Sequence, residues 1–159
     1  MPPTLDHIDK QIVDLLISDG RRSCSEIARA IGNISERSIR YRMVRLINEN
    51  IIHINAVVMP RSLGFSVMGD VFIEVEPGKV YEISQKIAEY ENVTYVGCST
   101  GEIDISAQVV AHDNVELYNF VNQEIGKIPG VRRVTASIIP VILKDVYYWH
   151  IPTSIIKED

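Results

Sequence analysis

The 159-residue chain has little of several features that mark particular classes of protein. Its 2 cysteines, Cys24 and Cys98, give no disulfide framework and no ligand spacing, so we expect no metal and no cofactor. No apolar run approaches the ~18 residues that a membrane span needs. The start, MPPTLDHIDK, lacks the basic-then-apolar pattern of a signal peptide, which favours a cytoplasmic protein.

Excess positive charge is also missing, since the net charge is −5 and a general polyanion binder is therefore excluded. The charges are unevenly distributed, however. Residues 1–62 hold nine basic and seven acidic side chains, whereas the remaining 97 residues hold seven basic and fourteen acidic ones. This pattern suits a DNA-binding module joined to a domain with another task.

Residues 21–50 predict two short helices that meet at a tight turn. Ser23 and Glu26 form a capping box for the first helix, and Gly32 with Asn33 ends it. Ser35 can cap the second helix, which has one buried face at the i, i+4, i+7, i+8 spacing of Ile39, Met43, Leu46 and Ile47. The arrangement is typical of a helix-turn-helix.

The other side of the second helix is rich in arginine. Helical geometry places there, or on its flanks, Arg37, Arg40, Tyr41, Arg42, Arg45 and Asn48. Guanidinium groups can bind phosphates or guanine edges, and Ser38 and Tyr41 offer single hydrogen bonds. A solvated basic helix is the plain alternative. The combination of cap, turn and arginine-rich face favours sequence-specific binding of double-stranded DNA.

The helix-turn-helix is flanked by further elements. Asp6 can cap a preceding helix that ends near Gly20, and IIHINAVV after Asn50 predicts a strand. Three helices and a strand indicate a winged helix-turn-helix over residues 1–60, followed by a linker at 61–65.

From residue 66 to 150 the pattern becomes strand, helix, strand, strand, helix, strand. The second of these helices places Val115, Tyr118, Val121 and Ile125 at helical spacing, which predicts that they face inward. Two split βαβ units predict a ferredoxin-like sandwich, leaving residues 151–159 as a C-terminal tail. The fold class is therefore α+β. Such a sheet leaves one face free, which predicts a homodimer.

Taken in order, four motifs resemble the Lrp/AsnC family, the feast/famine regulators of bacteria and archaea. They are Leu5-Asp6-x-Ile8-Asp9, the stretch Ser35–Leu46, Thr100-Gly101-x-x-Asp104 and Ile128-Pro129-Gly130-Val131. The resemblance covers about Leu5 to Trp149. It implies a transcriptional regulator that binds palindromic operators as a dimer or as an octamer, and that takes a small effector, commonly an amino acid, between subunits.

The resemblance also implies residue roles. Contacts with DNA would come from Ser35, Arg37, Ser38, Arg40, Tyr41, Arg42 and Arg45, with Arg42 and Arg45 on phosphates. The effector would lie at the loop Thr100, Gly101, Glu102, Ile103 and Asp104, near Cys98. Family members commonly carry two threonines in the last strand, where Val134 and Ala136 stand here. The effector is therefore different, more apolar, or absent.

Two other functions are compatible with this architecture. Sirohaem decarboxylases share it and would use groups such as His7, His53, His112, His150, Arg132, Arg133 and Tyr147. An assembly or sensing module that no longer binds DNA is the other alternative. The arginine-rich helix argues against both, so we expect a regulator and not an enzyme.

Overall fold

The computed structural model describes residues 4–157 and divides into two compact units. Unit 1 contains Met1–Val57 together with Leu143–Asp159, and unit 2 contains Val58–Ile142. These boundaries differ from those expected from the sequence, because the C-terminal residues belong with the N-terminal helices. None of the helices in the described range is long and apolar enough to cross a membrane.

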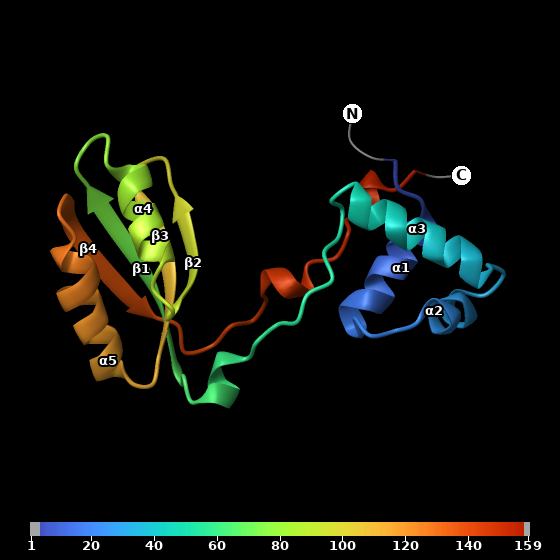
Figure 1. Cartoon of the computed structure of the whole chain (residues 1–159), viewed down its shortest axis with the longest axis horizontal. Helices are drawn as coiled ribbons and strands as arrows, with labels where there is room; N and C mark the ends of the chain where they lie inside the picture. Colours follow the sequence, from blue (N-terminus) through green and yellow to red (C-terminus); the bar gives the residue numbers. More distant parts are fainter. Residues whose placement is uncertain (1–3, 158–159) are drawn as a thin grey trace. The chain divides into compact units, whose positions relative to one another are not determined.

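Unit 1 contains the expected three helices, α1 (His7–Ser18), α2 (Cys24–Ile31) and α3 (Glu36–Asn48), shown in Figure 1. Asp6 and Ser23 form capping boxes at the starts of α1 and α2, and the Ser35 hydroxyl accepts from the Ser38 amide at the start of α3. Gly32 and Asn33 have positive φ and turn the chain between α2 and α3. The helix-turn-helix prediction is therefore confirmed in its local detail.

The strand predicted after α3 is absent from the described residues, so this prediction is wrong. Residues 52–59 are in no helix or strand, and no described segment pairs with them. The β-branched residues there favour extended backbone, but a strand also needs a hydrogen-bonded neighbour. The helix-turn-helix is present without this wing strand in the described residues.

Unit 2 is the predicted βαββαβ sandwich. Its elements are β1 (Val67–Val75), α4 (Val80–Ala88), β2 (Val93–Cys98), β3 (Ile105–Ala111), α5 (Asn114–Asn119) and β4 (Val131–Ile138). The strands form one antiparallel sheet in the order β2-β3-β1-β4. Both helices lie against one face of this sheet (Figure 1). The ferredoxin-like prediction is confirmed.

Alternation along the strands separates a buried face from an open one. Val71 and Ile73 of β1 pair with Ala107 and Ile105 of β3, and all four point into the core beneath α4 and α5. Their neighbours in the chain, such as Phe72, therefore point to the open face.

The inward orientation predicted for the second helix of the sandwich is confirmed at Val121 and Ile125 and is wrong at Val115 and Tyr118. Leu117, Val121 and Ile125 are buried, whereas Val115 and Tyr118 are 67% and 65% exposed, so their expected inward orientation was wrong. A turn of π-helix at Phe120–Glu124 follows α5 and changes the helical period.

A Cβ on Gly69 would lie 2.8 Å from Leu117 Cδ2, so this glycine leaves the space that Leu117 fills beside β1.

Candidate DNA-binding surface and effector loop

The exposed face of α3 carries the side chains best placed to reach a ligand. Arg37, Arg40 and Tyr41 are all exposed, and Tyr41 retains 71% of its accessible surface. Arg40 Nη2 lies 2.8 Å from Glu36 Oε1 one turn earlier, in an exposed pair that contributes only a few tenths of a kcal/mol. A phosphate could replace that carboxylate at little cost.

The opposite side of α3 is held by Ile39 and Leu46, which are fully buried in the core of unit 1.

Because Ser35 is used as the N-cap, its hydroxyl lies at the positive end of the helix dipole. A phosphate oxygen is favoured at such an end.

Arg42 and Arg45 do not lie free on the exposed face. Arg42 Nη1 donates to Asp6 Oδ2 at 2.7 Å and to Asp9 Oδ1 at 2.8 Å, and Arg45 Nη2 donates to the other oxygen of Asp9. Asp9 is fully buried. Each of these two arginines is therefore already paired with a carboxylate of the same unit, which favours a role in positioning α3 over the expected phosphate contact.

This network also shifts the pKa values of Asp6 and Arg42. Burial acts to raise the pKa of Asp6, but the Asp9 amide and the Arg42 guanidinium outweigh it and hold that pKa below its ordinary value. Burial acts to lower the pKa of Arg42, and the hydrogen bonds to Asp6 and Asp9 more than compensate, so that pKa is raised. Both groups are therefore held in their charged forms.

The β2–β3 loop was the expected effector site. Thr100, Gly101 and Glu102 are exposed, and Gly101 has a φ of +128° with open space where a side chain would project. Ile103 and Asp104 are half-buried. The loop is therefore accessible at its tip and anchored at its end.

Asp104 anchors the loop. Its Oδ2 accepts from the Val75 amide at 2.8 Å, and its own backbone closes the sheet end by pairing with Ser99 and Ile73. Arg132 Nη2 lies 3.9 Å from the same carboxylate. The Asp104 carboxylate therefore already accepts a hydrogen bond within the protein. The exposed Arg132 beside it adds positive charge at this end of the sheet.

Of the remaining expected effector residues, Cys98 ends β2 at the base of the loop, whereas Val134 and Ala136 lie on β4. Cys98, Val134 and Ala136 pair with the buried Ile105, Ile73 and Val71 and so lie on the helix-covered side. Cys98 Sγ is 3.3 Å from Ser84 Oγ of α4. Val134 and Ala136 are on β4 and Cys98 is on β2, the two opposite edges of the sheet.

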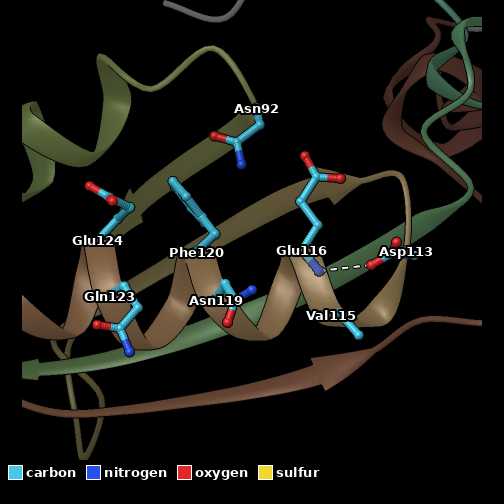
Figure 2. A pocket seen from close by; sticks show the side chains of 8 residues that line it. All are labelled: Asn92, Asp113, Val115, Glu116, Asn119, Phe120, Gln123 and Glu124. Carbon is cyan, nitrogen blue, oxygen red and sulfur yellow. Dashed lines mark hydrogen bonds between the residues drawn. The ribbon is translucent and has the colours of Figure 1, made fainter.

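A shallow hollow of about 490 Å³ lies on α5, away from that loop (Figure 2). Two of its carboxylates already have partners: Asp113 accepts from the Glu116 amide, and Glu116 accepts from the His112 amide and ring Nδ1. Phe120 stacks edge-on against Tyr90. No residue expected at the effector site lines it.

Two of the histidines considered for tetrapyrrole chemistry, His112 and His150, have separate local partners. His150 binds Asp14 in unit 1, whereas His112 binds Glu116 and packs against the Phe65 ring in unit 2. In the range 4–157, no group of three or more His, Cys, Asp or Glu side chains is placed to hold a metal ion.

Two family models match the chain, one to each predicted part. The AsnC-type helix-turn-helix domain matches residues 5–47, and the Lrp/AsnC ligand binding domain matches residues 70–147. An uncharacterised HTH-type transcriptional regulator of Pyrococcus furiosus is 37% identical over 141 residues, covering 88% of this chain and 95% of that protein. The regulator LrpA of Pyrococcus abyssi is 35% identical over 141 residues, covering 88% and 99%.

Solved structures agree on the fold. AsnC of E. coli superposes with a TM-score of 0.81 at 21% identity, over 91% of this chain and 99% of that one. A Neisseria meningitidis transcriptional regulator, solved as a complex with L-Met, also has a TM-score of 0.81 at 21% identity, over 89% and 94%.

An exposed basic helix in a helix-turn-helix, joined to a ferredoxin-like domain, defines a DNA-binding transcriptional regulator. The chain belongs to the Lrp/AsnC family.

Proposed function

We propose that α3 enters the major groove and reads sequence with Arg37 and Tyr41, while Arg40, Ser35 and Ser38 contact the backbone beside it. The observation that carries this assignment is the exposure of Arg37, Arg40 and Tyr41 on the face opposite the buried Ile39 and Leu46. An α-helix fits the major groove, and arginine binds guanine or phosphate there. The regulator would act in the cytoplasm.

Arg42 and Arg45 have a different part in this proposal. Their pairing with Asp6 and Asp9 ties α3 to the start of α1 and fixes the angle at which the exposed face is presented. They act on DNA binding through position and do not contact phosphates.

The test is competition binding on duplexes selected from a random library. We expect Tyr41→Ala to weaken binding to the selected site by about tenfold and to relax preference at particular base pairs. Tyr81→Ala is a matched control, because Tyr81 is 70% exposed on α4 of the other unit, close to the 71% of Tyr41. Equal affinity of both variants for the selected site would contradict the assignment of α3.

We also propose that the open face of the sheet packs against a second copy, so that the protein binds a loosely palindromic operator as a dimer or as a larger assembly of dimers such as an octamer. Phe72 lies on that face, between the buried positions of β1. In sedimentation experiments the wild type should be at least dimeric, and Phe72→Glu should shift it toward monomer. A monomeric wild type at micromolar concentration would contradict this part.

A small effector at the subunit junction, bound by the loop Thr100–Asp104, is the third part of the proposal. The exposed loop tip, the open position beside Gly101 and the cationic Arg132 support a ligand with a carboxylate, such as an amino acid. The Neisseria regulator of the same fold was solved with L-Met. Val134 and Ala136 are left out of the contact set because they lie on β4, at the opposite edge of the sheet from β2, and Cys98 is left out because it lies on the helix-covered side beside Ser84.

Ligand titration tests this part. An amino acid that binds should change assembly size or operator affinity, and Arg132→Ala should weaken that response. No change across the common amino acids and related carboxylates would leave the loop without an effector role.

A further inference from the structure

The C-terminal segment His150–Lys157 lies beyond both family matches, which end at residues 47 and 147, and it packs into unit 1. Ile151 and Ile156 are only 7% and 8% exposed and join the core formed by α1, α2 and α3. Ile155, next to one of them, is 54% exposed. The segment therefore presents one apolar side to the helices.

Backbone and polar contacts hold the same segment in register. Ile156 forms a parallel bridge with Leu5, and the Lys157 amide donates to the Leu5 carbonyl at 3.0 Å. His150 Nδ1 lies 2.7 Å from Asp14 Oδ1 of α1, whose other oxygen binds Lys10. The contacts at its two ends reach the start and the middle of α1.

We propose that His150–Lys157 is a C-terminal clamp that positions the recognition helix. Leu5, which the clamp holds, directly precedes Asp6, and Asp6 both caps α1 and binds Arg42 of α3. The clamp thus fixes the residue next to the carboxylate that anchors α3. This inference rests on the proposed DNA-binding role of α3 and adds to it a segment that need not touch DNA.

The clamp also gives unit 1 a second covalent link to the sheet of unit 2. The first link is the chain after α3, and the second is residues 139–149, which follow β4.

The experiment compares Ile156→Ala with Ile155→Ala in the full chain, at a temperature where both remain folded. Hydrogen exchange is measured in α3, and affinity for a selected duplex is measured over a range of salt. We expect Ile156→Ala to raise exchange in α3 and to weaken binding, each by about fivefold or more, with an unchanged salt slope because no phosphate contact is removed. Ile155→Ala should match wild type in both measurements.

Ile156→Val serves as the conservative rescue and should restore most of the affinity. Equal exchange in Ile156→Ala and Ile155→Ala overturns the clamp, whether or not the wild type binds DNA. Raised exchange with unaltered affinity overturns its positioning role. If the wild type binds no selected duplex, the proposed function of α3 fails, and the exchange comparison still decides whether the segment holds the helices.

Discussion

At the scale of single residues, Asp9 decides how α3 is held. It precedes Ile12 by three positions on α1 and therefore lies on the buried face of that helix, with no exposed surface. A buried carboxylate is stable only when it is paired, and Arg42 and Arg45 supply the partners. Helical spacing alone placed Arg45 on the free face and Arg42 on its flank, because it took no account of the neighbouring helix.

Removing this charge should destabilise unit 1 markedly. Asp9→Asn leaves Arg45 without its carboxylate, and we expect a loss of about 3 kcal/mol in the free energy of unfolding. Glu36→Gln, which breaks the exposed pair with Arg40, should lose less than about 0.5 kcal/mol. Urea denaturation of the two variants makes the comparison, and similar losses would show that the buried network does not hold the helices.

Asp6 makes stability depend on pH in acid. Its pKa in the folded protein lies below the ordinary value of 3.8, so its contribution is fully present above that value and is lost as pH falls through the lower, folded pKa. The unfolding midpoint of the wild type should therefore fall more steeply below about pH 4 than that of Asp6→Asn. If the unfolding midpoints of the wild type and of Asp6→Asn depend on pH in the same way, Asp6 does not make this contribution.

At the scale of elements, the caps are predictable because each depends on a few adjacent residues. Ser23 with Glu26, Ser35, and the turn residues Gly32 and Asn33 all take the predicted conformations. Contacts with elements distant in the sequence cannot be predicted from such local patterns. Residues 51–58 read as a strand, but no described segment pairs with residues 52–59, and the π-helical turn after α5 interrupts the regular helical period.

The cap of α3 gives a prediction about this element alone. Ser35→Ala leaves the Ser38 amide without its side-chain acceptor and should destabilise unit 1 by about 1 kcal/mol. Ser35→Asp should retain the stability, because aspartate caps as well as serine does. Thermal denaturation measures both, and an Ser35→Ala variant as stable as wild type would show that the cap contributes little.

At the scale of the whole molecule, the two predicted parts are present and the family membership follows from both. The packing of the C-terminal tail against the helices of unit 1 was not predictable. Ile151, Ile155 and Ile156 form too short an apolar set to show a period, and the partner of Ile156 is Leu5, at the other end of the chain. The turn between β2 and β3 was predictable from Gly101 and Asp104, but strand pairing was needed to show that Cys98 and Val134 lie on opposite edges of the sheet.

The most direct test of the account is the salt dependence of DNA affinity in two arginine variants. Arg40→Ala should lower the slope of log affinity against log salt by about 1, because it removes a phosphate contact. Arg42→Ala should weaken binding with an unchanged slope, because its guanidinium group binds Asp6 and Asp9. A lowered slope for Arg42→Ala and an unchanged one for Arg40→Ala would contradict the division between the side chains that contact DNA and those that hold the helix.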